Sequence, residues 1–193
     1  YNPSFKESYH IEQDEKVLIH VSNFRQVKRI DTIIDTFSKV RKQIKAKLLL
    51  IGDGPELLDM RMKVRELGLS DEVLFLGKQD CMSNFYQIAD IVLLMSEKES
   101  FGLTLLEAMK TGVIPIGTYA GGIQEVIQHE KTGYLVDIGD SDTAAHYALK
   151  LLKDPELYQT MQQRMLKDVE TRFHSQNIAD QYEYYYKQML GEL

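Results

Sequence analysis

Cysteine and clustered histidine are scarce in this chain. Cys81 is the single cysteine among 193 residues, so the chain cannot build a disulfide framework of its own or a thiolate metal site. The five histidines are scattered and show no H-x-x-x-H spacing, which gives no indication of a bound metal. His20 lies inside an apolar run and is predicted to be a core histidine.

Long apolar runs and an excess of basic charge are also absent. No stretch approaches the roughly 20 apolar residues of a membrane span, and no signal peptide is visible. The formal net charge of −6 argues against a nucleic-acid partner, because neutralising a phosphate backbone requires a basic surface. Together with the single cysteine, this predicts a reducing, cytoplasmic location.

Two common catalytic motifs are missing and a third is incomplete. Neither G-x-x-x-x-G-K-[ST] nor G-x-S-x-G occurs. Gly52-Asp-Gly-Pro55 begins like the dinucleotide fingerprint, but it lacks the third glycine and follows the second predicted strand rather than the first. We interpret it as a tight turn that caps a helix, and we expect neither NAD nor FAD.

What is present is an alternation of short apolar runs with amphipathic helical patterns. The predicted strands cover residues 17–21, 48–51, 73–76, 91–95, 113–117 and 134–136, and the pattern after about residue 140 is purely helical. Continuous apolar strands separated by helices are typical of a parallel sheet covered on both faces. The predicted fold class is therefore α/β, with a Rossmann-like sheet of about six strands and closing C-terminal helices.

Two carboxylates follow the fourth predicted strand, with a helix start between them. The segment runs from Glu99 to Glu107, and the helix is predicted to begin near Gly102. The backbone N–H groups of residues 101–104 would then point outward at a helix N-terminus, which suits a phosphate. Flanking carboxylates accept hydrogen bonds from hydroxyl groups, so the segment predicts a nucleotide-sugar site.

Basic residues follow the first predicted strand. Because ligands of parallel sheets bind beyond the carboxyl ends of the strands, Arg25 and Lys28 are expected on the same sheet edge as Glu99. Arginine offers a fork to phosphate oxygens and lysine a point charge. The alternative interpretation of both residues is a solvated helix start.

These residues resemble the retaining glycosyltransferases of family 4. Residues 99–109 match the form E-S-F-G-x-x-x-x-E-A-M of the family's E-x7-E motif, and further matches in the family's order are Gly52–Pro55, Phe75–Gly77, Ala89–Asp90 and Gly121–Gly122 with Glu125. The specific motifs cover roughly residues 16 to 140. The resemblance implies one half of a two-domain GT-B fold and retaining hexosyl transfer from a nucleotide sugar, with no metal and no cofactor.

The resemblance also implies roles for individual residues. Glu107 would hold the ribose hydroxyls, Glu99 the donor sugar, and Lys28 the phosphate. The family often has Gly-Arg where this chain has Ser22-Asn23, and the arginine comes later, at Arg25. Lys28, Arg25 and Glu99 are the catalytic candidates, and the donor-binding candidates are Ser22, Asn23, Arg25, Lys28, Gly77, Lys78, Glu99, Ser100, Phe101, Gly102, Leu103, Thr104 and Glu107. Among them, the Gly77-Lys78 turn is predicted to contact the base.

Two stretches narrow the resemblance to one group within the family. Residues 20–29 and 96–102 resemble the enzymes that transfer N-acetylglucosamine from UDP to L-malate in bacillithiol synthesis. The expected donor is therefore UDP-GlcNAc and the expected acceptor L-malate. The alternatives are a family member with a lipid or polysaccharide acceptor, a UDP-GlcNAc 2-epimerase, and a non-catalytic α/β module.

The resemblance also predicts a domain division. Residues 1–15 are expected to be an interdomain linker, residues 16–175 the nucleotide-sugar-binding domain, and residues 176–193 a tyrosine-rich helix that packs toward an N-terminal domain absent from this sequence. Because that domain supplies most of the acceptor pocket in the family, we expect this chain alone to bind UDP weakly and to transfer nothing. A homo-oligomer is a possible state of the full-length protein.

Overall fold

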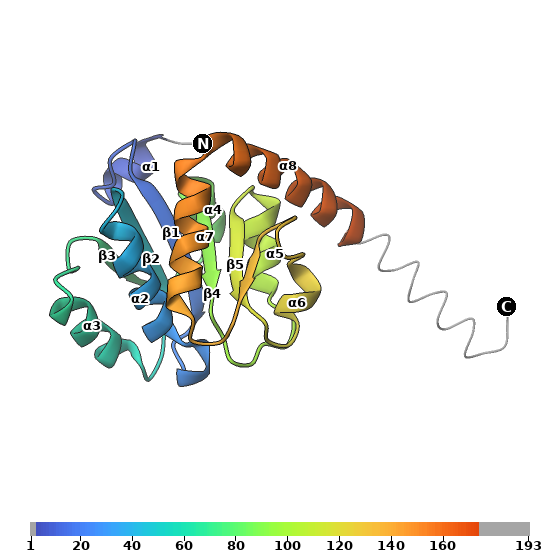
Figure 1. The fold of residues 1–193 in the computed structure, drawn as a ribbon. Helices are drawn as coiled ribbons and strands as arrows, with labels where there is room; N and C mark the ends of the chain where they lie inside the picture. The colour runs from blue at the N-terminus through green and yellow to red at the C-terminus, as the bar shows by residue number, and fades with distance from the viewer. Residues whose placement is uncertain (1–2, 174–193) are drawn as a thin grey trace, which may run out of the picture.

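The computed structural model of the chain describes residues 3–173 (Figure 1). Its centre is a sheet of six parallel strands in the order β3-β2-β1-β4-β5-β6. The strands are β1 Lys16–Asn23, β2 Ala46–Asp53, β3 Val73–Gly77, β4 Ile91–Leu94, β5 Ile114–Thr118 and β6 Tyr134–Val136. The central strands are apolar along their length because helices cover both faces of the sheet. The predicted Rossmann-like fold class is confirmed.

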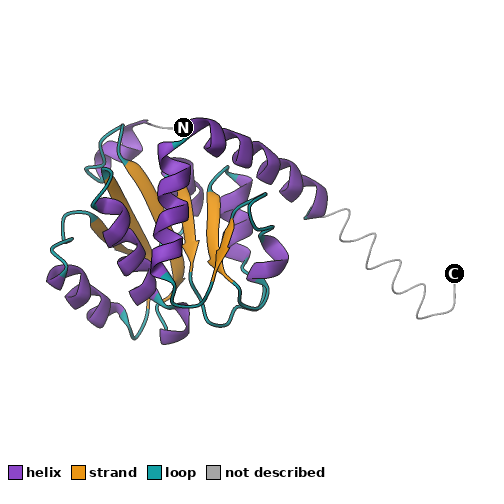
Figure 2. Cartoon of the chain, in the orientation of Figure 1, coloured by secondary structure: helices purple, strands orange, loops and turns teal. Residues whose placement is uncertain are grey.

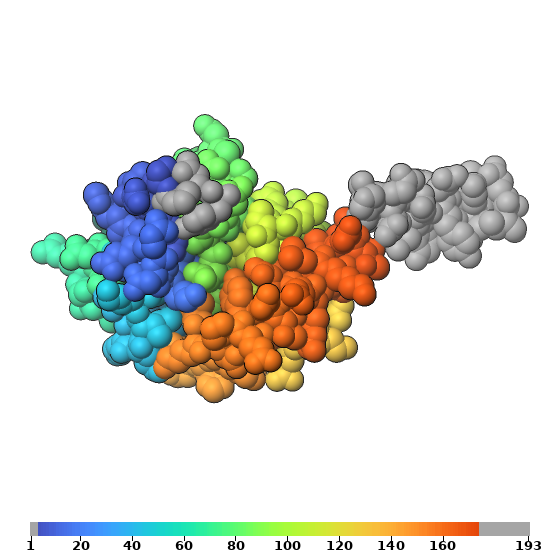
Figure 3. All heavy atoms as spheres, turned by 90° about the horizontal axis from the view of Figure 1, so that it is seen from above, coloured from blue at the N-terminus to red at the C-terminus, as the bar shows by residue number. Residues whose placement is uncertain are grey.

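Helices connect the strands and form the outer layers (Figure 2). The helical segments are α1 Pro3–Ser8, η1 Gln26–Lys28, α2 Ile30–Arg41, α3 Leu57–Glu66, α4 Met82–Ile88, α5 Leu103–Lys110, α6 Ile123–Val126, α7 Ser141–Lys153 and α8 Pro155–Arg172. In Figure 1, α2 and α7 lie in front of the sheet, and α4 and α5 lie behind it. Seen from above, α8 lies beside α5 and α7 (Figure 3).

Local sequence signals explain where the last two helices begin. Asp140 caps α7 by accepting a hydrogen bond from the Thr143 N–H at 2.9 Å. Asp154 caps α8 in the same way through the Leu157 N–H, and Pro155 occupies the first turn, where its missing N–H costs nothing. The C-terminal helix expected over residues 176–193 lies outside the described residues.

The first part of the chain, expected to be a linker, contains α1 and packs on the domain. The Phe5 ring meets the ring of Phe85 on α4 edge to face, with 5.0 Å between the centroids. Ile11 is 2% exposed, and the Lys6 ammonium donates to the Glu15 carbonyl oxygen at 2.8 Å. Residues 5–15 therefore add apolar contacts to the sheet domain.

The strand order reverses between β1 and β4, and the two strands part there. β1 pairs with β2 along all eight of its residues, but its register with β4 covers only Leu18 with Ile91 and Ile19 with Val92. Beyond these pairs, the His20 imidazole enters the gap and its Nδ1 lies 2.9 Å from the Leu93 carbonyl oxygen. The carboxyl edge of the sheet is thus open at its centre, where ligands of such folds bind.

Candidate functional site

Two segments far apart in the sequence meet at this opening. The turn after β1, residues 24–29, contacts the segment after β4, residues 95–102. The Glu97 N–H donates to the Val27 carbonyl oxygen at 2.9 Å, and the Lys28 ammonium donates to the Glu99 carboxylate at 2.6 Å. Both side chains of the Lys28–Glu99 pair are 17% exposed, so the pair is largely shielded but still reachable from solvent.

Arg29 provides a further link between the two segments. Its guanidinium donates two hydrogen bonds to Asp31, each 3.0 Å long, and one to the Glu97 carboxylate at 2.9 Å. The hydrogen bonds that Arg29 donates to Asp31 and, to a smaller extent, to Glu97 raise the pKa of Arg29 above its usual value. The charged Arg29 guanidinium therefore ties the turn after β1 to the segment that leads to Glu99.

The N-terminus of α5 forms one wall of the opening. Gly102 is the N-cap, with a left-handed φ of 81°, and its carbonyl oxygen accepts the Leu105 N–H at 2.9 Å. The N–H groups of Leu103 and Thr104 precede this bond, at positions of a helix that have no intrahelical acceptor. They and the helix dipole provide partial positive charge for an anion.

The two segments enclose two adjoining hollows. The inner cavity has a volume of about 370 Å³ and is lined by Val21, Ser22, Asn23, Lys28, Leu94 and residues 99–104. The outer cavity has a volume of about 390 Å³ and is lined by Asn23, Arg25, Val27, Lys28, Glu97, Lys98, Glu99, Ser100 and Gly121. The Lys28–Glu99 pair lines both. Arg25 lines the outer cavity rather than the inner one, which separates it from the α5 N-terminus.

Most of the predicted donor-binding residues are thus brought together, and three lie elsewhere. Gly77 ends β3 and Lys78 follows it; both are exposed and line neither cavity. Glu107 is exposed on α5, and its carboxylate accepts a hydrogen bond from the Tyr86 hydroxyl at 3.3 Å. These three residues would meet a ligand only if it extended beyond the inner cavity along the sheet edge.

His20 contacts Ser22, which lines the inner cavity. Its Nδ1 faces the Leu93 carbonyl oxygen, which can only accept, so Nδ1 carries the proton and Nε2 accepts from the Ser22 hydroxyl at 2.7 Å. Burial lowers the pKa of His20 to about 4, and the ring is therefore neutral at pH 7. The Ser22 oxygen keeps its lone pairs for a ligand hydroxyl. The prediction of a core histidine is confirmed.

A pair of glycines packs behind Glu99 and Ser100. A Cβ at Gly121 would lie 2.1 Å from the Glu99 carbonyl oxygen, and one at Gly122 would lie 2.4 Å from that of Ser100. The Gly122 N–H donates to the same Glu99 oxygen at 3.0 Å. The absence of side chains here allows the backbone of the site segment to rest directly on the turn after β5.

Gly52-Asp-Gly-Pro55 also supports a neighbouring turn. The sequence predicted only its helix-capping turn and not this second contact. The Gly54 carbonyl oxygen accepts from the Leu57 N–H at the start of α3, as a helix-capping turn requires. A Cβ at Gly54 would also lie 2.7 Å from the backbone of Phe24. The motif therefore supports the turn after β1 from the side of β2. The glycine pattern in the sequence does not reveal which segment the motif contacts.

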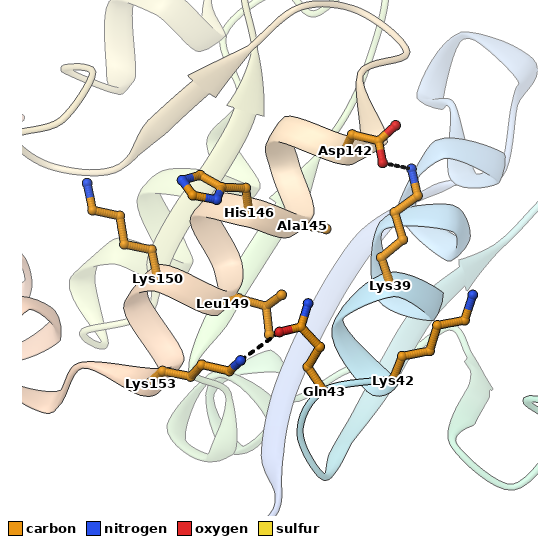
Figure 4. Close-up of a pocket in the computed structure, with 9 residues that line it drawn as sticks. All are labelled: Lys39, Lys42, Gln43, Asp142, Ala145, His146, Leu149, Lys150 and Lys153. Atoms are coloured by element: carbon orange, nitrogen blue, oxygen red, sulfur yellow. Dashed lines mark hydrogen bonds and ion pairs between the residues drawn. The ribbon is translucent and has the colours of Figure 1, made fainter.

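A further cavity of about 670 Å³ lies between α2 and α7, away from these residues (Figure 4). It is lined by four lysines, at positions 39, 42, 150 and 153. Lys39 is paired with Asp142, and Lys153 donates to the Gln43 side chain at 2.6 Å. Figure 4 shows that Lys42 and Lys150 point away from each other, so the four amino groups do not converge on one ligand.

The described residues contain no candidate metal cluster and no helix suited to span a membrane. Within residues 3–173, no three side chains of His, Cys, Asp or Glu lie close enough together to hold a metal ion. No helix among the described residues combines the length and apolar character needed to cross a membrane.

Comparison with known proteins gives consistent matches. The family model described as "Glycosyl transferases group 1" matches residues 2–168. The N-acetyl-alpha-D-glucosaminyl L-malate synthase of Bacillus anthracis is 50% identical over 187 residues, which are 97% of this chain and 49% of that protein. The chain spans about half the length of the first curated relatives it matches.

Solved structures agree. The C-terminal domain of the glycosyl transferase group 1 family protein LpcC from Francisella tularensis has a TM-score of 0.81 and 25% identity, over 90% of this chain and 93% of that domain. HepE from Anabaena, in complex with UDP and glucose, has a TM-score of 0.88 and 23% identity, over 100% of this chain and 53% of that protein. At this identity, the likeness is evidence for the fold alone.

Proposed function

Since the chain belongs to the group 1 glycosyltransferases, we propose that it binds the donor UDP-GlcNAc and serves the retaining transfer of N-acetylglucosamine to L-malate. The observation that carries the proposal is the Lys28–Glu99 pair at the α5 N-terminus, because an ammonium group suited to phosphate lies beside a carboxylate suited to sugar hydroxyls. The identity of 50% to the malate synthase supports this choice of donor and acceptor.

The diphosphate fits the positive groups of the inner cavity. Lys28, Leu103 and Thr104 all line the inner cavity. As the bond from the sugar C1 to the diphosphate breaks, negative charge gathers on the leaving oxygen, and fixed positive groups are most effective at that point. Arg25 would act on the diphosphate from the outer cavity, whereas Lys28 lines both cavities.

The sugar and ribose meet carboxylates. Glu99 accepts hydrogen bonds from donor-sugar hydroxyls and orients the sugar without attacking it, and Glu107 accepts from the ribose. The base lies at the Gly77-Lys78 turn. Donor binding must redirect Lys28 from Glu99 toward the diphosphate, so the ion pair of the free site is exchanged for two interactions with the donor.

The transfer step then balances without an enzymic nucleophile. The C1–oxygen bond to UDP breaks, a bond from C1 to the malate hydroxyl oxygen forms on the same face, and the hydroxyl proton leaves with UDP. Attack from the leaving-group face retains the configuration at C1. We propose that Lys28, Arg25 and the helix N-terminus stabilise the leaving group and that no metal ion is required.

Two experiments test the proposal. In the first, titration of the 193-residue chain with UDP should shift the NMR signals of residues 99–104, while shifts centred elsewhere would favour a non-catalytic module. In the second, a full-length protein that includes these residues is incubated with UDP-GlcNAc and L-malate. GlcNAc-malate and UDP should appear together, and succinate, which lacks the hydroxyl group, should accept nothing.

The second experiment also separates the alternatives. Transfer to a lipid or polysaccharide but not to malate would keep the glycosyltransferase and change the acceptor. A changed sugar in the absence of any acceptor would indicate a 2-epimerase.

A further inference from the structure

Tyr86 is a buried tyrosine whose hydroxyl contacts Glu107, the carboxylate proposed to bind the ribose. It lies on α4 and is 2% exposed, whereas Glu107 is exposed on α5. The Tyr86 hydroxyl donates to Oε2 of Glu107 at 3.3 Å. One oxygen of an otherwise solvent-facing carboxylate is thus held from inside the domain.

The phenol is suited to act as a permanent donor. Burial, followed by the negative charge of Glu107, raises the pKa of Tyr86 above its usual value of 10. The hydroxyl therefore keeps its proton throughout the range in which enzymes work. A buried hydroxyl also needs a partner, because leaving it unsatisfied is costly.

This contact has a consequence for the orientation of Glu107. A glutamate on an exposed helix surface samples several rotamers, and ordering it on binding costs free energy. A hydrogen bond to one oxygen removes much of that freedom before any ligand arrives. The second oxygen stays free to accept from a ligand, and preorganisation of this kind raises affinity without adding a contact.

We infer that Tyr86 is a positioning residue that holds Glu107 ready for the two ribose hydroxyls of a nucleoside diphosphate, and so sets the preference for ribose over 2′-deoxyribose. The inference rests on the proposed function, since it assumes that Glu107 faces the ribose. It adds a residue that touches no part of the donor.

The chain offers a matched control in Tyr158. Its hydroxyl lies on α8 and donates to the Asp90 carbonyl oxygen at 2.8 Å, away from both cavities. Burial raises the pKa of Tyr158 as well. Tyr158→Phe therefore removes a hydrogen-bonded phenol hydroxyl from a half-buried tyrosine that does not contact Glu107, and it measures the general cost of such a change.

The experiment compares the affinities of UDP and 2′-deoxy-UDP by calorimetry in the wild-type chain, Tyr86→Phe, Tyr158→Phe, Glu107→Gln and the Tyr86→Phe/Glu107→Gln double variant. The wild type should prefer UDP by about tenfold, since a hydrogen bond to a charged group is lost with the 2′-hydroxyl. In Tyr86→Phe the preference should fall to about twofold, while Tyr158→Phe keeps it. In the Glu107→Gln background, Tyr86→Phe should change nothing further.

Each remaining outcome is decisive. If Tyr86→Phe keeps the full ribose preference, or if the wild type binds UDP without any preference, the inference is overturned while the proposed donor site stands. If the wild type does not bind UDP at all, the proposed function fails and the inference fails with it.

Discussion

The Lys28 ammonium lies 2.6 Å from the Glu99 carboxylate, although the two residues are 71 positions apart in the chain. One residue belongs to the turn after β1 and the other to the segment after β4. The proposed function assigns the cation for phosphate to the first segment and the acceptor for sugar hydroxyls to the second. Lys28 and Glu99 come together where the two segments meet, and the strand order determines that place.

Replacing Lys28 with alanine should lower turnover by about 10²-fold or more, because a fixed positive charge at the leaving oxygens is lost. The measurement is the steady-state rate of UDP release in a full-length protein that includes the chain. Unchanged turnover would reject a catalytic role for Lys28.

The change also leaves Glu99 without its ion-pair partner, so folding must be followed separately. A thermal melt of Lys28→Ala shows whether the domain is intact, and Lys131→Ala, which removes an exposed lysine outside both cavities, serves as the matched control. A surface lysine of this kind should leave turnover as it is.

Gly121→Ala should disturb the site more than Gly68→Ala does. Both glycines have a left-handed backbone, with φ of 49° and 68°, but a Cβ at Gly121 would lie 2.1 Å from the Glu99 carbonyl oxygen while nothing lies within 4 Å at Gly68. The left-handed conformation costs about 1–2 kcal/mol in each variant. Overpacking should add about 1–3 kcal/mol at Gly121 alone.

Urea unfolding and UDP titration of the two glycine variants check this. UDP affinity should fall only in Gly121→Ala, because the clash moves the segment that carries Glu99. Equal UDP affinities in the two variants would show that the turn after β5 does not support the site.

Transfer should continue undiminished in EDTA. In the proposed mechanism, Lys28, Arg25 and the N-terminus of α5 supply the positive charge that a divalent ion provides in other transferases. The assay compares UDP release before and after chelation, with Mg²⁺ and Mn²⁺ restored in parallel samples. A loss in EDTA that either ion reverses would contradict a metal-free mechanism.

The stability of the domain should fall as the pH drops from about 6.5 to 4, in part because of His20. Burial lowers the pKa of His20 to about 4 in the folded protein, compared with 6.5 for a free imidazole. The unfolded chain therefore binds the proton first, and protonation favours unfolding. The contribution is fully present above pH 6.5 and is lost as the pH falls through 4; its size is about 3 kcal/mol.

Urea unfolding at a series of pH values measures this effect. His20→Gln should flatten the dependence of the unfolding free energy on pH within that range, at the cost of lower stability at pH 7. His146→Gln, which removes an exposed imidazole, should leave the slope unchanged. Equal slopes for wild type and His20→Gln would show that another group titrates there.

The sheet could be predicted from the sequence because burial on both faces leaves a direct mark on composition. All six predicted runs overlap observed strands, and the fifth is displaced by one residue, from 113–117 to Ile114–Thr118. The start of α5 was also predictable, because Gly102 precedes an apolar helix and takes the left-handed cap conformation. Ladder hydrogen bonds decide where strands end, and these depend on partners that the local sequence does not reveal.

Contacts between elements were harder to predict. The pairing of Lys28 with Glu99 follows from the strand order and from the directions of the side chains at the sheet edge. The strand order has a signal in the sequence, but the side-chain directions do not. Tyr86 looks like a core aromatic on an amphipathic helix, since its ring is buried and only its hydroxyl reaches Glu107. The packing of α1 on α4 depends on Phe5 and Phe85, two aromatics with no periodic pattern to connect them.

The short register between β1 and β4 has a mechanical consequence. The sheet is continuous from β3 to β1 and from β4 to β6, but β1 and β4 share only two register pairs, compared with the eight that join β1 to β2. A donor bound by Lys28 in one half and by the N–H groups of α5 in the other would cross the boundary between β1 and β4, here called the seam. It would thereby link the two halves of the sheet and stabilise them together. Amide hydrogen exchange should then slow on both sides of the seam when UDP binds, including strands that never touch the nucleotide.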